Sequence, residues 1–563
     1  MKLKTYFNAA LLCLAAGLLA ACVDDIMGDG NKDKQAQEEV KGVKFTTNEP
    51  KMRAMSRALV DDDGNVVEQT ATRTLIKHTP GLGADAYWDA NDYIFVKNKY
   101  NQWKKSIAIS LFDDGRSAEF TLPGVPDDYA EGCEVRYTIT PSLLVDEADA
   151  AIIPFNQTQS APNDFSHAGR VGDSGIGTAH DKGNGMFNFE LQHLPHYLCF
   201  LPRCENASLA NNIRLTKIRL DNDNSDGTTE VVGATYLLDQ DPFNSVGIDT
   251  RYNAIELQST DGNGFPIAAT TADAAADACY MAILPGEHDL ILTYTIKDPT
   301  TNVETKITKK VSGTFKSGEI TDITSNLSLR NQPMYYTWDS ENNVGDIQYD
   351  SSSPTTLSAT TATVYAFGFG DANVPGTTAH VDNTVSPTNP KRIDATHTYM
   401  NGVPNVNEMM WYAYKGDARW VNQGPVIAVS GNLVRTAGVW LKKKTKILAD
   451  EHITEAYMRD GFALGGGAYT DYRINPINGT APKVSVGTSL PANLDDYFFV
   501  PALGYYVHYG NNWYDFYNPE GYYWTSSATP TSPSVAYGLY FSQTGISIKE
   551  NYVYNPYCVL PFE

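Results

Sequence analysis

The chain has 563 residues, a formal net charge of −23 at pH 7 and 34 tyrosines. Such a charge argues against nucleic acid as a partner and against a basic membrane-surface helix, because both need an excess of positive side chains. The length allows three domains of about 150 residues each. Abundant tyrosine and threonine, without long leucine- or alanine-rich helical stretches after residue 21, favour a mainly β fold.

The first residues have the features of a secretory signal. Lys2 and Lys4 precede an apolar run, residues 8–21, that is too short to cross a bilayer. The run ends in Leu19-Ala-Ala-Cys22, which resembles the lipobox of bacterial lipoproteins, and the following Val23-Asp-Asp resembles a surface-export signal of Bacteroidetes lipoproteins. We expect residues 1–21 to be removed and Cys22 to carry acyl chains such as palmitate, which would anchor the chain to the outer membrane. The alternative is an ordinary signal peptide with a chance cysteine.

Residues 22–57 predict a second processing event. A polar tether is followed by Gly42–Thr47, which alternates apolar and polar residues as a short strand does. The next segment, residues 51–58, is basic, and Arg53 and Arg57 are natural sites for a trypsin-like protease. A cut before Ala58 would release the lipid together with the strand. We expect that strand to lie at the edge of a sheet, so that its loss leaves unpaired backbone groups and an apolar groove.

Two successive β-sandwiches of Greek-key, transthyretin-like type are predicted, at residues 58–193 and 194–330. Both regions consist of short alternating runs separated by Gly, Pro, Asn and Asp at the spacing of sandwich strands. The clearest runs are Tyr93–Lys97, Ser106–Ser110, Val135–Ile139, Ile213–Leu220, Tyr280–Leu284 and Leu290–Ile296.

Several of these runs resemble the fimbrillin-type, or major fimbrial subunit-like, proteins of Bacteroidetes. The similar segments are Trp88-Asp-Ala-Asn-Asp-Tyr-Ile-Phe-Val96, Phe187–Leu194, Ile283-Leu-Pro-Gly286, Phe315–Ile323 and Ser56-Arg-Ala58. The resemblance covers roughly residues 22–330. It implies polymerisation by strand addition, in which proteolysis opens a groove and a strand of a neighbouring fimbrial subunit fills it.

The composition changes after a linker and entry segment at residues 331–394. Residues 391–563 hold 19 of the 34 tyrosines and five of the eight tryptophans. A helix is predicted over Val406–Trp420 with Asn407 as its cap. The later runs Asp496–Gly504, Gly521–Ser527, Ala536–Ser542 and Tyr557–Pro561 resemble the "major paralogous" domain of Bacteroidetes and Fibrobacter surface proteins. That resemblance implies an α+β, C-type-lectin-like domain at residues 395–563.

Cysteine usage points to buried thiols. Removal of Cys13 and acylation of Cys22 leave Cys133, Cys199, Cys204, Cys279 and Cys558, an odd number. A bridge between Cys199 and Cys204 is possible, but free thiols are favoured because most lie in apolar runs. No Cys/His arrangement has the sequence spacing of a zinc site.

No catalytic constellation is evident, so we expect a protein that is not an enzyme, without cofactor or metal. The sequence lacks a nucleophile elbow, a zinc-protease motif and a phosphate loop. Residues 221–227 resemble a calcium loop, but Val232 stands where the bidentate glutamate belongs. Asp515 and Glu520 are the nearest candidates for a glycosidase pair, and nothing in their spacing supports that role.

An aromatic segment is the candidate ligand site. Tyrosine and tryptophan facing water stack well on sugars or peptides, whereas the same residues facing inward form a core. We expect Tyr523, Trp524, Phe498 and Phe499 in the core. The candidate ligand-binding residues are Tyr505, Tyr509, Trp513, Tyr514, Tyr517 and Tyr522.

These features together predict the tip subunit of a fimbria. The removable strand is an acceptor feature, whereas Tyr557–Glu563 is expected to close its own domain and so cannot act as a donor. The partners would be a neighbouring subunit and a host or bacterial surface ligand, either glycan or protein. Two alternatives remain: a lipid-anchored surface glycan-binding protein that does not polymerise, and a carbohydrate-active enzyme.

Overall fold

The computed structural model describes residues 41–47, 58–60, 75–138, 147–223, 231–238, 251–329, 334–336, 338–339, 395, 400–429, 431–477, 479–509, 512–516, 519–530, 532, 535–553 and 555–562. Within these ranges the fold is mainly β, as the composition predicts. The two sandwiches and the lectin-like domain stay predictions. No helix in these ranges is long and apolar enough to span a membrane. Cys22, Arg53, Arg57 and Tyr517 lie outside the described residues.

An eight-stranded sheet surrounds the first core. Its order is β6 (Trp103–Lys105), β5 (Phe95–Lys97), β9 (Glu134–Thr138), β12 (Ser174–Gly183), β13 (Met186–His193), β1 (Val43–Thr47), β8 (Ser117–Leu122), β7 (Ala108–Phe112). Apolar side chains on one face of the sheet form the core, and the loop residues Trp88 and Tyr129 pack into it. Trp88 meets Phe120 and Tyr137 edge-on, with ring centroids 5.0 and 5.5 Å away.

This sheet folds over onto its own core. Its two edge strands, β6 and β7, are consecutive in the chain, yet β6 pairs with β5 and β7 with β8. Between them, Ser106 N donates to Ile94 O at 2.9 Å and Ile107 N donates to Thr121 O at 2.8 Å. The short stretch from Trp103 to Phe112 therefore joins the two ends of the sheet.

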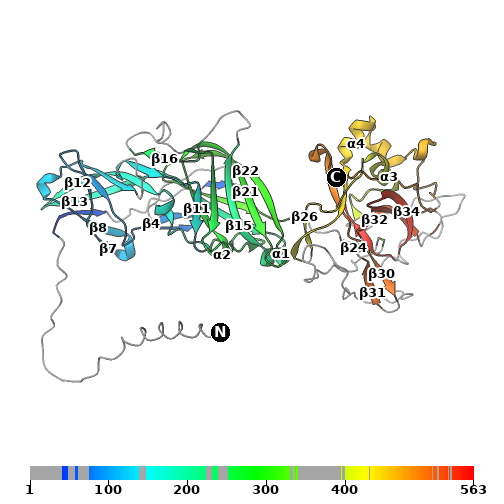
Figure 1. Cartoon of the computed structure of the whole chain (residues 1–563), viewed down its shortest axis with the longest axis horizontal. Coiled ribbons are helices and arrows are strands. Elements are labelled where there is room, and N and C mark those ends of the chain that lie inside the picture. Colours follow the sequence, from blue (N-terminus) through cyan, green and yellow to red (C-terminus); the bar gives the residue numbers. More distant parts are fainter. Residues whose placement is uncertain are drawn as a thin grey trace, which may run out of the picture. The chain divides into compact units, whose positions relative to one another are not determined.

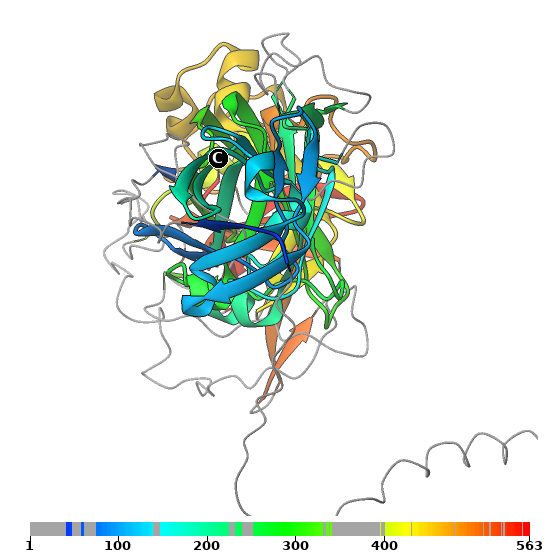
Figure 2. The ribbon, with the colours of Figure 1, turned by 90° about the vertical axis from the view of Figure 1, so that its left-hand side faces the viewer.

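The predicted edge position of the strand at Gly42–Thr47 is wrong. The strand forms, as β1, but it lies inside the eight-stranded sheet, parallel to β13 on one side and antiparallel to β8 on the other (Figures 1 and 2). An interior strand contributes hydrogen bonds along both of its edges, so its removal would open two facing strand edges instead of one.

Two five-stranded sheets share the second core. One has the order β11 (Asn156–Gln159), β18 (Ala254–Ser259), β15 (Arg214–Asn222), β21 (Gly286–Lys297), β22 (Glu304–Phe315). The other has the order β19 (Ala268–Ala269), β14 (His196–Cys204), β23 (Ile320–Asn326), β2 (Ala58–Val60), with β20 (Cys279–Ile283) also on β14. Phe200 and Ile283 of the second sheet meet Leu220 and Leu292 of the first within one apolar cluster.

Smaller elements complete this region. They are β10 (Ala150–Ile152), β16 (Gly233–Leu237) and β17 (Arg251–Tyr252) in a three-stranded sheet, the hairpin of β3 (Leu75–Thr79) and β4 (Gly83–Tyr87), and helices α1 (Ala207–Asn212) and α2 (Ala274–Asp277). The strands do not divide at residue 193 as predicted. β2, β10 and β11 precede that position but pair with β23, β16 and β18, which follow it.

The third region combines sheets and helices. A five-stranded sheet has the order β24 (Met334–Tyr336), β35 (Tyr557–Val559), β32 (Glu520–Ala528), β33 (Val535–Ser542), β34 (Gly545–Tyr552). A three-stranded sheet has the order β25 (Arg419–Val421), β28 (Gly438–Lys442), β29 (Tyr497–Pro501). Two hairpins pair β26 (Val426–Val429) with β27 (Asn432–Arg435) and β30 (Tyr505–Tyr509) with β31 (Asn512–Phe516). Its helices are α3 (Val406–Lys415), α4 (Lys444–Glu451) and α5 (Glu455–Asp460).

Helix α3 is shorter than the predicted Val406–Trp420, and its cap is different. Asn405 caps it: its side chain accepts from Glu408 N, and the Glu408 side chain accepts from Asn405 N, which is a capping box. Asn407 is fully buried and donates to Asp471 Oδ1 at 2.8 Å. Trp420 belongs to β25 instead.

All five cysteines that follow Cys22 are free thiols in the structure. Cys199, Cys204, Cys279 and Cys558 are buried and Cys133 is half-buried. Cys199 and Cys204 lie on the same strand, β14, and form no bridge. The preference for buried thiols over a small disulfide loop is confirmed.

Candidate functional site

The alternation of β1 decides which of its side chains enter the core. Val43, Phe45 and Thr47 are buried, whereas Lys44 and Thr46 are half-buried. Phe45 lies opposite Phe120 of β8 and Phe187 of β13, one on each side. The strand thus presents a row of alternate side chains to the core, which is how an added strand gains specificity.

Phe45 is the anchor of β1. It has no solvent exposure, its ring stacks on Phe187 at 4.7 Å with 9° between the planes, and Tyr129 meets it edge-on at 5.2 Å. Complete burial of a phenylalanine stabilises by about 1.5–3 kcal/mol, and each aromatic pair adds about 0.5–1.5 kcal/mol.

Polar side chains fix the register of β1. Thr47 Oγ1 accepts a hydrogen bond from Ala118 N at 2.9 Å, and Thr46 Oγ1 donates to Phe187 O at 3.2 Å. Lys44 Nζ lies 3.0 Å from Glu119 Oε1. A strand replacing β1 would therefore meet a groove with an apolar floor and polar positions on both walls.

In the sequence, the predicted cleavage point falls between two strands that belong to different sheets. β1 belongs to the eight-stranded sheet, whereas Ala58 begins β2, which pairs in parallel with β23 at Thr321, Asp322 and Ile323. The segment between β1 and β2 contains Arg53 and Arg57. A cut there would separate β1 from the chain and leave a new amino terminus at the start of β2.

The strand nearest the carboxyl end is already paired. β35 lies between β24 and β32, antiparallel to the first and parallel to the second. Beyond it, the Phe562 ring lies 5.0 Å from Tyr412 and 5.1 Å from Phe498, centroid to centroid. Cys558, Leu560 and Phe562 thereby belong to the core of their own region.

The aromatic segment forms a two-stranded hairpin. β30 pairs antiparallel with β31, placing Tyr505 opposite Phe516, Val507 opposite Tyr514, His508 opposite Trp513 and Tyr509 opposite Asn512. The hairpin brings together the backbone of four of the six candidate ligand residues, Tyr505, Tyr509, Trp513 and Tyr514. Their role in binding stays a prediction.

Tyr505 and Tyr522 meet at the base of this hairpin. Both are half-buried, with ring centroids 4.5 Å apart, and Tyr522 also packs against Tyr557 at 5.1 Å. The Tyr522 hydroxyl donates to Glu520 Oε2 at 2.8 Å, and burial together with this carboxylate raises the pKa of Tyr522 above its usual range. The two residues support the hairpin more than they face solvent.

Of the four aromatic residues predicted to lie in the core, all but Phe499 are buried. Tyr523 and Trp524 have no exposure and Phe498 is buried, as expected of core residues. Phe499 is half-buried, and it packs against Trp440 at 5.4 Å. Glu520 is engaged by two tyrosines, since Tyr540 also donates to its Oε1 at 2.9 Å.

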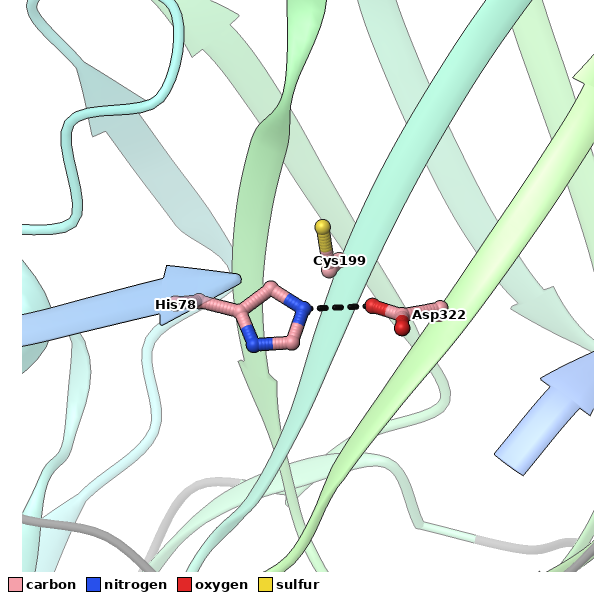
Figure 3. Close-up of side chains that lie close together, drawn as sticks. All are labelled: His78, Cys199 and Asp322. Atoms are coloured by element: carbon pink, nitrogen blue, oxygen red, sulfur yellow. Dashed lines mark hydrogen bonds and ion pairs between the residues drawn. The ribbon is translucent and has the colours of Figure 1, made fainter. Parts of the chain in front are cut away.

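A buried cluster that the sequence did not indicate lies in the second region. His78 of β3, Cys199 of β14 and Asp322 of β23 lie close together, and one potential ligand atom of each lies within 4.8 Å of the other two (Figure 3). Burial, followed by the nearby Asp322 charge, raises the pKa of the Cys199 thiol well above its usual value. Since His78 and Asp322 are 244 positions apart, no short-range spacing could have revealed the cluster.

No family model matches the chain, and no curated protein matches it. Solved structures similar to it include a candidate cell adhesion protein from Bacteroides fragilis, at 9% identity over 51% of this chain and 94% of that chain, with a TM-score of 0.26. A second candidate cell adhesion protein, from Bacteroides eggerthii, has 10% identity over 51% of this chain and 88% of that chain, with a TM-score of 0.26. A fimbrial protein from Bacteroides ovatus has 12% identity over 92% of this chain and 98% of that chain, with a TM-score of 0.18. TM-scores this low carry no argument about function.

Proposed function

We propose that this chain is an adhesive subunit of a cell-surface fimbria that accepts a strand from a neighbouring subunit in place of β1. One observation carries the proposal: β1 is an interior strand, paired on both sides, and a basic segment with two arginines follows it directly. A strand that merely covered an edge could be lost with little effect. The loss of this one leaves a vacancy in the middle of a sheet.

Proteolysis makes the exchange possible without unfolding the sheet. Before the cut, β1 is held both by its contacts and by its covalent connection to β2. After a cut at Arg57, or at Arg53, only the contacts remain, and a donor strand at high local concentration can displace it. The donor would recover the backbone hydrogen bonds to β8 and β13 and fill the position of Phe45 with its own apolar side chain.

The pairing of β35 is the basis for proposing that this subunit lies at the tip of the filament. This strand is paired with β24 and β32, so it is not free to enter the groove of another subunit. A subunit that accepts a strand while its own β35 stays in place would occupy the end of a filament. Residues 395–563 would then face outward, with the β30–β31 hairpin as the proposed contact for a glycan or protein ligand.

The proposed route begins at the membrane. A lipidated Cys22 would hold the exported chain on the outer membrane until the protease releases it into the filament. The role is binding and assembly, not catalysis, and it needs no cofactor.

A strand-replacement experiment tests the proposal. The full chain is cut at Arg53 or Arg57 by limited trypsin treatment, and a fluorescent synthetic peptide of residues 41–48 is added in excess. We expect slow, stoichiometric incorporation into the cut chain and none into the uncut chain. A matched peptide with Phe45→Asp should not enter. Equal labelling of cut and uncut protein, or incorporation of both peptides, would refute strand acceptance at this groove.

A further inference from the structure

The buried cluster at His78, Cys199 and Asp322 has the composition of a metal site. The potential ligand atoms are His78 Nε2, Cys199 Sγ and an Asp322 carboxylate oxygen, and all lie within 4.8 Å of one another. Figure 3 shows a His78 ring nitrogen and an Asp322 carboxylate oxygen facing each other, with the Cys199 side chain beside them and its sulfur pointing away from the line that joins them. Imidazole nitrogen, thiolate sulfur and carboxylate oxygen are the ligands that zinc takes in proteins.

The surrounding backbone orients two of the ligands. His78 Nδ1 lies 2.9 Å from Gly83 O, and Gly81 N donates to Asp322 Oδ2 at 2.8 Å. Zinc-binding histidines commonly donate their second ring nitrogen to a carbonyl in this way, and zinc-binding carboxylates are likewise held by a hydrogen bond on the second oxygen. The β3–β4 turn supplies both partners, leaving Nε2 and Oδ1 directed at each other.

The arrangement needs a positive centre between these two atoms. A carbonyl oxygen only accepts, so Nδ1 carries the hydrogen in its bond to Gly83, and neutral His78 then turns the Nε2 lone pair toward the carboxylate. Nε2 and Asp322 Oδ1 are 2.5 Å apart, and two bare acceptors would repel at that separation. A proton fits between the two atoms at this distance, whereas a zinc ion, with bonds of about 2.0–2.2 Å to each of them, would bind only after they separate.

We propose that this cluster binds one zinc ion through His78 Nε2, Cys199 Sγ and Asp322 Oδ1. A thiolate and a carboxylate balance the two positive charges, so the occupied site is neutral, as a buried site requires. Zinc–nitrogen and zinc–sulfur bonds are about 2.0–2.1 and 2.3 Å, so the His78–Asp322 contact widens and the sulfur moves inward on binding.

The site would fix the β3–β4 hairpin to the sheet that receives β2. Asp322 is also the register partner of Leu59, two positions after Arg57. The metal would therefore stabilise the part of the fold in which the chain begins after cleavage. This role does not depend on strand acceptance or on any ligand of the third region.

Metal content and cobalt spectroscopy of the full chain test the site. Protein produced with zinc supplied should retain about one zinc per chain after gel filtration, and a strong chelator should lower the melting temperature of the second region by roughly 5 °C or more. Cobalt(II) replacing zinc should give the near-ultraviolet charge-transfer band of a cobalt–thiolate bond.

Matched variants separate the metal from a mere packing effect. Cys199→Ser should lose the cobalt–thiolate band and bind zinc at least tenfold more weakly, whereas Cys279→Ser, another buried thiol of the same sheet, should keep both. Asp322→Asn should weaken binding similarly while keeping side-chain volume. Wild-type protein without zinc and with a melting temperature indifferent to chelator would establish a proton-bridged ion pair instead. Zinc that Cys199→Ser binds equally well would also overturn the assignment.

Discussion

Phe45 stacks face to face on Phe187 at a centroid distance of 4.7 Å, and this contact joins the strand proposed to leave the protein to a strand that stays. Phe187 belongs to β13, which retains its other neighbour, β12, whether or not β1 is present. If β1 is exchanged as proposed, the Phe187 ring stays in the groove and Phe45 is the partner that a donor side chain replaces. The proposed strand exchange depends on that asymmetry.

Truncation of the anchor should destabilise the eight-stranded sheet. Phe45→Ala removes a fully buried ring and leaves a cavity, at a cost of about 3–5 kcal/mol. Amide hydrogen exchange along β8 and β13 should accelerate, while exchange in β33 and β34 stays unchanged. Thr46→Ala, at a half-buried neighbouring position, should change the free energy of unfolding by less than about 1 kcal/mol. Similar effects of the two substitutions would contradict the anchoring role of Phe45.

The carboxyl-terminal strand should behave as a permanent part of its sheet. Phe562→Ala should lower the stability of the third region by about 3 kcal/mol, because the ring packs against Tyr412 and Phe498. Tyr552→Ala, whose side chain is 54% exposed, is the control and should have little effect. A labelled peptide of residues 555–562 should not enter the β1 groove of the cut protein. Its entry would remove the basis for the tip position.

The stability of the first core should decrease between about pH 4 and pH 7. Burial, the largest cause, raises the pKa of Asp92 from 3.8 to about 7, although Asp89 N and the Tyr137 hydroxyl both donate to its carboxylate. The folded state therefore holds a proton that the unfolded state releases above pH 3.8, and folding is penalised increasingly until the folded carboxyl ionises near pH 7.

Asp92→Asn should remove this pH dependence and stabilise the protein above pH 7 by up to about 4 kcal/mol, which is the energy equivalent of the pKa shift. Urea unfolding at several pH values measures the effect. Asp113→Asn, at an exposed position, should leave the profile unchanged. An unaltered profile in Asp92→Asn would show that other groups carry the dependence.

The hairpin β30–β31 should matter for binding and not for folding. Trp513→Ala is expected to reduce attachment of the purified chain to target cells at least tenfold without changing its melting temperature. Tyr523→Ala, which empties a fully buried position on β32, should instead lower the melting temperature of the third region. Equal attachment by wild type and Trp513→Ala would exclude Trp513 from the ligand contact.

Local sequence patterns predicted where strands form better than they predicted which strands pair with one another. Apolar alternation placed a strand at Gly42–Thr47, and the structure has β1 at Val43–Thr47. Its interior position depends on pairing with β8 and β13, which lie far along the chain, and alternation carries no information about such partners. The same limit explains why β2, β10 and β11 crossed the predicted boundary at residue 193.

Side-chain roles were harder to predict where several residues could fill them. Asn405 and Asn407 are both suitable caps for α3, and tertiary contacts settled the choice, since Asn407 is buried against Asp471. The buried cluster had no sequence signal, because its three residues come from three separate strands. The aromatic composition drew attention to the segment that forms the β30–β31 hairpin, but it did not distinguish Tyr522, which packs at the base, from the other candidate ligand residues.

The amino terminus of this chain within native filaments shows whether β1 has been removed and replaced. Filaments sheared from the cell surface are purified, and the terminal peptide of this chain is identified by mass spectrometry. Strand exchange predicts a terminus at Ala58, or at Ala54 after a cut at Arg53, with β1 absent from the filament fraction. A lipidated Cys22 terminus, with β1 still attached and no association with filaments, would contradict strand exchange and leave a surface-anchored binding protein.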